Sequence, residues 1–225
     1  MTHHADTEAD AVLIKRLLRE AMGGWELDLS ERQLDQLSTH FALLVQWNRK
    51  INLTSLRRPE EIATRHFGES LWLAKVLGRS EETAEGLLID VGSGAGFPGL
   101  PLKTVWPSLP TILLEPNQKK AAFLKEVARR CGIEGVEIRT DRLEEAVRGD
   151  CAGRASLVTI RAVAATKDFV RDLRKLLRRD GQLALFIGAT DADDLAKAPG
   201  FQWLPPVPIP HSERRVILIG RNARI

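Results

Sequence analysis

The stretch of sequence that decides the fold covers residues 87–99 and reads LLIDVGSGAGFPG. Its apolar start, Leu87 to Val91, has the length and composition of a strand that is buried on both faces. Glycines follow this strand directly, and such a turn lets the backbone approach a ligand closely. The stretch therefore predicts the first strand, the ligand loop and the first helix of a doubly wound α/β sheet.

Downstream of this stretch, short apolar runs alternate with helical patterns. Buried strands are predicted at residues 87–91, 112–114, 136–138, 157–160 and 183–187, and helices at 97–106, 117–131, 141–148 and 166–179. Two further strands, 201–204 and 214–220, are joined by a Pro-rich segment with no room for a crossover helix, so they should pair antiparallel. The pattern predicts a Rossmann-like, seven-stranded, mostly parallel sheet with an antiparallel C-terminal strand.

Upstream of residue 80 the sequence has helical periodicity instead. Ser30 and Gln33 form a capping-box pattern at the start of the second of two amphipathic helices. A third helix is predicted to begin at Pro59 and to end near Gly78. We therefore expect an N-terminal helical extension over residues 1–80 and an α/β domain over residues 81–225, packed as one compact unit.

Composition limits the class of protein more than it identifies a function. The 225 residues include 33 basic and 30 acidic side chains, a formal net charge of +3, so an anionic partner would be bound by local patches. Two cysteines without a zinc-ligand pattern predict no disulfide framework and no metal site. The chain lacks a long apolar run, so we expect a cytoplasmic protein that does not cross a membrane, and without an obvious apolar helical seam we expect a monomer.

The glycine loop alone fits two cofactors. Gly94, Gly96 and Gly99 spell the dinucleotide pattern, which would indicate a nicotinamide-dependent oxidoreductase. Asp90 at the strand end favours S-adenosylmethionine, because it could hold the amino-acid moiety and would repel a pyrophosphate. Phe97-Pro98 favours it too, because proline lacks an amide hydrogen that a phosphate could use.

Two later strand ends provide further candidate cofactor contacts. Glu115 ends the second strand, where its carboxylate could accept both ribose hydroxyls of either cofactor, although it could also be a simple exposed charge before a helix. Leu143 and Glu144 follow the third strand and could lie beside an adenine. An ordinary helix start, with acids in its first turn, is the competing interpretation of these two residues.

The whole pattern resembles a known family, the bacterial 16S ribosomal RNA guanine-N7 methyltransferases, also called RsmG or glucose-inhibited division protein B. The glycine loop followed by Phe-Pro-Gly carries this resemblance together with upstream and downstream segments. These segments are Trp47-Asn48, Ile51 to Ser55, Arg65-His66, Glu69-Ser70, Leu143 to Glu145, Ile160 to Ala162 and Glu213-Arg214. Two departures are visible: Ile187 stands where the family commonly has Lys, and Glu69 where it often has Asp.

The resemblance implies a class I S-adenosylmethionine-dependent methyltransferase fold and methylation of a guanine of the small-subunit decoding region. Matched by position, cofactor contacts would come from Gly92, Phe97, Leu143, Glu144 and Arg161. Arg161 would also orient the substrate through guanine O6 or a phosphate, unless it forms a salt bridge with a neighbouring carboxylate. No general base is expected, because guanine N7 already has a free lone pair.

Candidate RNA contacts come from the helical extension. They are Asn48, Asn52, Thr54, Arg57, Arg58, Arg65 and His66. The Asn and Thr residues could instead be caps and turns, and Arg65 and His66 could be solvated helix positions.

Three other functions remain open: the oxidoreductase, a methyltransferase of small molecules or proteins, and a non-enzymatic RNA-binding protein. Binding of S-adenosylmethionine without affinity for NAD(P)H would exclude the oxidoreductase. Methyl transfer to ribosomal particles would distinguish the rRNA methyltransferase from the other two functions.

Overall fold

The computed structural model describes residues 2–23, 27–78, 85–161 and 165–223, with the side chains of residues 2–10 left out. Its helical elements are α1 (Thr2–Ala21), α2 (Glu31–Asn48), α3 (Pro59–Ile62), the π-helix η1 (Ala63–Gly68), α4 (Glu69–Leu77), α5 (Gly99–Val105), α6 (Gln118–Arg130), α7 (Leu143–Ala146), α8 (Lys167–Arg174) and α9 (Ala189–Leu195). Its strands are β1 (Leu88–Val91), β2 (Thr111–Leu114), β3 (Val136–Arg139), β4 (Ala155–Arg161), β5 (Leu177–Gly188), β6 (Phe201–Trp203), β7 (Val207–Pro208) and β8 (Arg215–Asn222).

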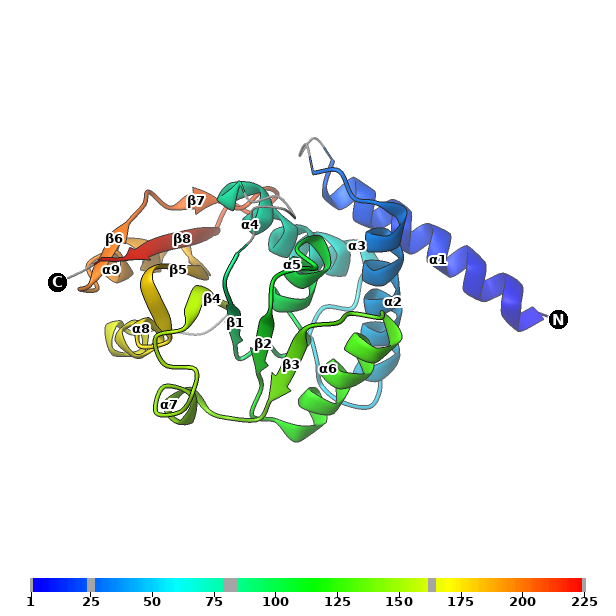
Figure 1. The fold of residues 1–225 in the computed structure, drawn as a ribbon. Helices are drawn as coiled ribbons and strands as arrows, with labels where there is room; N and C mark the ends of the chain where they lie inside the picture. Colours follow the sequence, from blue (N-terminus) through cyan, green and yellow to red (C-terminus); the bar gives the residue numbers. More distant parts are fainter. Residues whose placement is uncertain (1, 24–26, 79–84, 162–164, 224–225) are drawn as a thin grey trace.

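The sheet has the order β3-β2-β1-β4-β5-β8-β6, with β7 paired to β8 beside this path (Figure 1). Strands β1 to β5 run parallel, and β8 is antiparallel to β5, β6 and β7. The chain order reverses at β1, which lies between β2 and β4. In sheets of this kind ligands bind outside the carboxyl ends of the strands at that switch point, which here is the end of β1 and β4.

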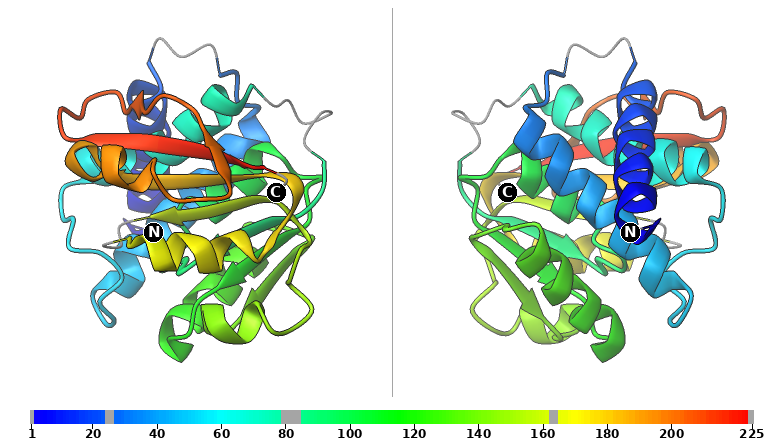
Figure 2. Two further views of the ribbon diagram at one scale, coloured as in Figure 1. Left: turned by 90° about the vertical axis from the view of Figure 1, so that its left-hand side faces the viewer. Right: turned by 90° about the vertical axis from the view of Figure 1, so that its right-hand side faces the viewer.

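Helices cover both faces of the sheet (Figure 2), because alternate strand residues point to opposite sides. In β1, Leu88 belongs to the core cluster shared with the N-terminal helices, α5 and α6, whereas Ile89 belongs to the cluster shared with α7, α8 and α9. Both side chains are fully buried. The first cluster also contains Leu18 and Phe41 of the extension, so residues on either side of position 80 pack into the same core.

The N-terminal helices follow the sequence prediction closely. Ser30 caps α2 in a reciprocal capping box with Gln33, and α4 ends at Gly78 in the left-handed conformation (φ 60°). The third predicted helix is interrupted by η1, where Arg65 and His66 lie. A π-helical segment of this kind often marks a functional site, and the spacing of apolar residues did not indicate it. Residues 79–80 of the predicted extension lie outside the described residues.

Two sequence predictions about the end of the sheet are corrected. The helix predicted over 166–179 ends at Arg174, and β5 already begins at Leu177. Asp180, with φ 59°, and Gly181 divide this long strand, whose residues 178–180 are exposed. An eighth strand, β7, occupies the Pro-rich segment that was predicted to be only a connection. None of the helices in the described part of the chain is long and apolar enough to cross a membrane.

Candidate active site at the carboxyl ends of β1, β2 and β4

The glycine loop forms an open backbone turn after β1. Gly92 has φ 67° and is exposed, and a Cβ added there would meet no atom within 4 Å. Gly96 is different, because a Cβ there would lie 2.5 Å from Leu100 Cδ1. Gly94 donates its amide to Glu115 Oε2 at 2.8 Å. The loop therefore presents accessible backbone at Gly92 and is held tightly underneath, a shape that fits a ligand lying against it.

Asp90 supports this loop from inside the protein. Its carboxylate accepts hydrogen bonds from Thr159 Oγ1 (2.7 Å) and from the Gly99 amide (3.2 Å), and the residue has no exposed surface. Burial raises the pKa of this carboxyl to about 6, and the hydrogen bond from Thr159 opposes the rise. Any influence of Asp90 on a ligand therefore passes through the loop and helix start that it positions.

The other predicted cofactor residues line the neighbouring strand ends. Glu115 is buried at the end of β2, and its Oε1 accepts the Asn117 amide at 2.9 Å. Leu143 is buried at the start of α7, and Glu144 beside it is exposed. Each carboxylate oxygen of Glu115 keeps acceptor capacity beyond its one amide partner. These positions are compatible with an adenosine group that lies across the carboxyl edge of the sheet.

Three aromatic rings connect the glycine loop to the extension. Phe97 lies between His40 of α2 and His66 of η1, with ring centroids 4.8 Å and 4.6 Å apart and nearly parallel planes. His40 Nε2 donates to the Ala95 carbonyl at 2.8 Å, inside the loop. Burial lowers the pKa of His40 to about 4 and that of His66 to about 3. Both imidazoles are therefore neutral at pH 7, and the extension forms one wall of the site.

Arg161, at the end of β4, forms an ion pair with Glu69 of α4. It also donates to the backbone carbonyl groups of Arg65 and His66. Glu69 binds a second guanidinium, that of Arg215 on β8, through its other carboxylate oxygen. Burial lowers the pKa of Arg161 to about 10, which still leaves it charged at pH 7. Burial raises the pKa of Glu69, and the charges of Arg161 and Arg215 oppose that rise.

A cavity of about 300 Å³ lies over this ion-pair cluster. Its wall includes Arg161, the side chain of Phe186 on β5, and the loop that precedes α3. Because His66 lines the cavity and stacks on Phe97, the cavity lies beside the glycine loop. His66 Nδ1 is buried and has no hydrogen-bond partner among the described residues. A buried nitrogen without a partner is costly in a folded protein, so this ring position lacks the stabilisation that its neighbour Nε2 obtains from Thr54.

The predicted RNA residues of the extension separate into internal and exposed groups. Asn48 fastens its own loop, because its Oδ1 accepts the amides of Leu53 and Thr54 and its Nδ2 donates to the Thr54 carbonyl. Thr54 Oγ1 lies 2.8 Å from His66 Nε2, and both side chains face inward. Exposed side chains belong to Asn52, Arg57, Arg58 and Arg65.

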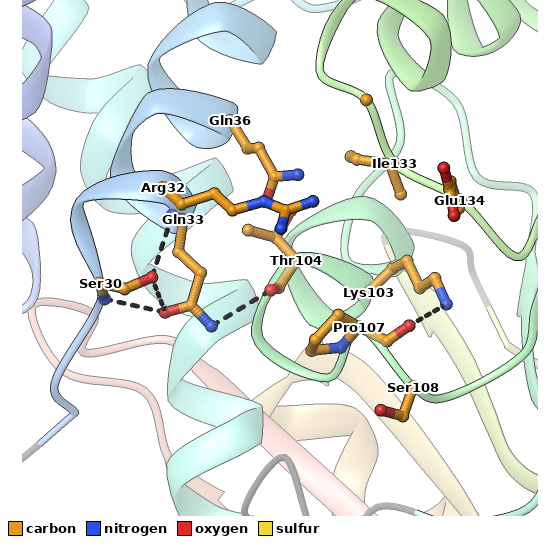
Figure 3. A pocket seen from close by; sticks show the side chains of 11 residues that line it. Ser30, Arg32, Gln33, Gln36, Lys103, Thr104, Pro107, Ser108, Ile133 and Glu134 are labelled. Atoms are coloured by element: carbon orange, nitrogen blue, oxygen red, sulfur yellow. Dashed lines mark hydrogen bonds between the residues drawn. The ribbon is translucent and has the colours of Figure 1, made fainter.

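A second cavity, of about 340 Å³, lies between α2 and the end of α5 (Figure 3). The buried Lys103 lines it and donates to the carbonyl groups of Pro107 and Leu109, in the loop that leads into β2. This cavity therefore lies at the amino ends of the parallel strands. None of the predicted site residues lines it, and the topology of the sheet favours the cavity at the carboxyl ends.

Three contributors to the site escaped the sequence analysis. His40 was not singled out in the sequence, and Glu69 was named only in the Glu69-Ser70 segment of the resemblance and as a departure from the family pattern. Arg215 follows the Glu213-Arg214 segment but gave no signal of its own. The register of β8, which opposes Arg215 to Gly188 of β5, brings this side chain to the carboxyl edge of the sheet. Ala162, part of the quoted Ile160 to Ala162 segment, lies outside the described residues.

The protein-family model described as rRNA small subunit methyltransferase G matches residues 33–201 of the chain. The chain belongs to this family. The ribosomal RNA small subunit methyltransferase G of Chloroflexus aggregans is 39% identical over 186 residues, which are 82% of this chain and 76% of the relative. The protein of that name from Roseiflexus castenholzii is 37% identical over 212 residues, 90% and 88% of the two chains.

Solved structures agree on the fold. A SAM-dependent methyltransferase from Aquifex aeolicus superposes with a TM-score of 0.59 and 13% identity over 76% of this chain and 97% of the other. The class I methyltransferase fold with an N-terminal helical extension, implied by the resemblance, is thereby confirmed. The oxidoreductase hypothesis, which rested on Gly94, Gly96 and Gly99 alone, is not supported by the family match.

Proposed function

We propose that the protein transfers a methyl group from S-adenosylmethionine to N7 of a guanine in 16S ribosomal RNA of the small subunit. Membership of the rRNA small subunit methyltransferase G family makes it an rRNA methyltransferase. The observation that carries the proposal is the cavity beside the glycine loop, lined by Arg161 at the switch point of the sheet. A flat or blocked carboxyl edge would have left no room for a base next to the cofactor loop.

The proposed cofactor site combines an open turn with acceptors at its edge. Gly92 and Gly94 provide backbone, Gly96 and the buried Asp90 hold the turn, and Glu115 accepts ribose hydroxyl groups. Phe97, Leu143, Glu144 and Arg161 complete the surroundings. The fit rests on the open space above Gly92 and on the acceptor capacity left on Glu115. When bound, the cofactor supplies an electrophilic methyl group on a sulfonium.

The protein's own contribution to the reaction is positioning. In-line transfer needs the reacting atoms about 3 to 3.5 Å apart, and the guanine N7 lone pair needs no proton removed. Arg161 would hold the base through O6 or an adjacent phosphate with the N–H groups that its ion pair leaves over. His66 is neutral at pH 7, and its ring stacks on Phe97 in the wall of the cavity, so it adds no charge beside the methyl donor.

The remaining assignments concern the surroundings of the site. RNA contacts would come from the exposed side chains of the extension, which are Asn52, Arg57, Arg58 and Arg65. The inward-facing residues would instead shape the wall from which these side chains project, and they are Asn48, Thr54 and His66.

We also propose that residues 1–80 and 81–225 form one unit that acts as a monomer in the cytoplasm. Contacts such as Gln33 Nε2 to the Thr104 carbonyl (3.3 Å) join the two parts.

The proposal is tested by transfer of labelled methyl from S-adenosylmethionine to 30S subunits from a host that lacks its own enzyme, followed by nucleoside digestion. We expect a single product, 7-methylguanosine, and its loss in Arg161→Ala. Arg129→Ala is the matched control, because Arg129 is an exposed arginine on the surface of α6 whose charge partner is Glu126. Cofactor binding without incorporation, or a different methylated nucleoside, would contradict the proposal.

A further inference from the structure

We propose that Arg215 binds a phosphate group of the RNA substrate beside the target guanine, anchored on the same buried carboxylate as Arg161. This inference rests on the proposed function and adds a substrate contact to it. Arg215 comes from β8, and its side chain lines the cavity over the ion-pair cluster. It was not among the residues predicted from the sequence.

The cavity is positively charged. Three guanidinium groups line it, those of Arg65, Arg161 and Arg215, against the single carboxylate of Glu69. The fifth titratable side chain, His66, is neutral, because burial lowers its pKa to about 3. Two positive charges are therefore left without a partner charge in the wall, and guanidinium groups pair well with phosphate oxygens. An anion is the ligand that this arrangement favours.

Of the two arginines on Glu69, Arg215 is the better placed to meet a ligand. The side chain of Arg161 is 12% exposed, and three of its N–H groups are used by Glu69 and by the carbonyl groups of Arg65 and His66. The side chain of Arg215 is 27% exposed. Two of its five N–H donors are committed, one to Glu69 and one to Ser212 Oγ at 3.2 Å. Arg215 therefore has a free donor edge that opens to the cavity.

Strand register explains how Arg215 takes this role in this chain. Ile187, near the end of β5, is a buried apolar side chain, so position 187 supplies no cation to this edge of the sheet. The next residue, Gly188, pairs directly with Arg215 across the β5–β8 ladder. The positive charge beside the end of β5 therefore comes from the neighbouring strand, β8. Glu69, longer than Asp by one methylene, reaches Arg161 with one oxygen and Arg215 with the other.

The test measures binding of 30S subunits and of a 16S rRNA fragment as a function of salt. We expect Arg215→Gln to weaken RNA binding about tenfold near 0.1 M salt and to reduce the slope of log Kd against log salt by about 0.7–0.9, the value for one phosphate contact. Arg215→Lys should keep most of the slope, because lysine still neutralises a phosphate. Affinity for S-adenosylmethionine should be unchanged in both variants.

Arg221→Gln is the matched control. Arg221 lies six positions along β8, on the same side of the strand, and is exposed with Asp180 as its charge partner. This variant should keep the wild-type slope. If Arg215→Gln also keeps it, or if Arg215→Lys loses as much as Arg215→Gln, Arg215 is not a phosphate contact. If the glutamine variant fails to fold, Arg215→Ser is measured in its place, and a wild-type slope in that variant overturns the role of Arg215.

Failure of this inference can be distinguished from failure of the proposed function. If wild-type protein makes no 7-methylguanosine in 30S subunits, the proposed function fails together with the identity of the RNA substrate. If it makes that product and Arg215→Gln binds RNA with the wild-type salt slope, only the role of Arg215 is overturned.

Discussion

At the scale of single residues, the side chains that complete the site are paired across long stretches of chain. Arg161 and Glu69 are separated by 92 positions, and no local pattern predicts that they meet. Sequence reasoning left two interpretations of Arg161 open, a substrate contact and a salt bridge, and the structure contains the salt bridge. By contrast, the open turn at Gly92 could be predicted from the sequence, because a glycine loop after a buried strand depends on local backbone geometry.

His40 gives a prediction about pH. Its pKa is about 4 in the folded protein and about 6.5 in the unfolded chain, so below pH 6.5 the unfolded chain binds a proton that the folded protein does not. Stability conferred by neutral His40 is therefore present above pH 6.5 and is lost as the pH falls toward 4. Relative to His40→Gln, wild-type protein should lose about 1.4 kcal/mol of unfolding free energy per pH unit over this range.

The measurement is urea unfolding of wild type and His40→Gln at about pH 7, 6 and 5. Other buried groups titrate in the same range, Asp90 among them, and taking the difference between the two proteins cancels their contribution. A difference that stays constant from pH 7 to pH 5 would mean that His40 is not held neutral by the fold.

At the scale of elements, the sequence predicted most helices and strands but misplaced the boundary between α8 and β5. Leu173, Leu176 and Leu177 keep a helical spacing, so the pattern extended the helix to residue 179. In the structure the chain turns after Lys175, and Leu177 pairs with Ala155 of β4 instead. Both arrangements bury the same leucines, which is why apolar periodicity alone could not decide between them.

The glycine loop yields a prediction with a matched control. Gly92 and Gly78 both have positive φ, 67° and 60°, and a Cβ at either would meet no atom within 4 Å. An alanine at either position should therefore lower the free energy of unfolding by a similar amount, about 1–2 kcal/mol, because its backbone is strained at positive φ. Only Gly92→Ala places a methyl group in the proposed cofactor space, so calorimetry should show at least tenfold weaker S-adenosylmethionine binding for that variant. Equal affinities in Gly92→Ala and Gly78→Ala would remove Gly92 from the cofactor site.

The loop before α3 gives a second prediction of this kind. Asn48 makes three hydrogen bonds to the backbone of residues 53 and 54, whereas the side chain of Asn52 is exposed. Asn48→Ala should lower the free energy of unfolding by about 1–3 kcal/mol, because it leaves backbone groups unpaired. Asn52→Ala should change it by less than about 0.5 kcal/mol. Chemical denaturation of both variants tests the assignment, and a reversed order of stability would contradict it.

At the scale of the whole molecule, the extension and the sheet share structural elements. Trp72 of α4 donates from Nε1 to the Pro208 carbonyl at 3.1 Å, and Gln36 of α2 donates to the Cys131 carbonyl at 3.0 Å. One core cluster contains Phe41 and Leu44 of the extension together with Leu100 and Phe123 of the sheet's covering helices. Such a shared core predicts that residues 1–80 do not unfold separately from residues 81–225.

This cooperativity can be measured directly. Unfolding in urea followed by far-ultraviolet circular dichroism and by tryptophan fluorescence should give one coincident transition, because helices and tryptophans occur in both parts of the chain. Two transitions with different midpoints would show that the extension folds as a unit of its own, and residues 1–80 would then be a separate domain.

The position of β8, one strand in from the edge of the sheet, has a consequence for how the protein is made. This strand lies between β5 and β6, yet it follows all the strands with which it pairs in the sequence. During synthesis, the hydrogen-bonding edge of β5 stays uncovered until residues 215–222 have emerged from the ribosome, and such an edge invites pairing with other chains. Arg215 enters the cavity with that same strand. The cavity that Arg215 lines is thus completed only when β8 joins the sheet, in the same step that covers the edge of β5.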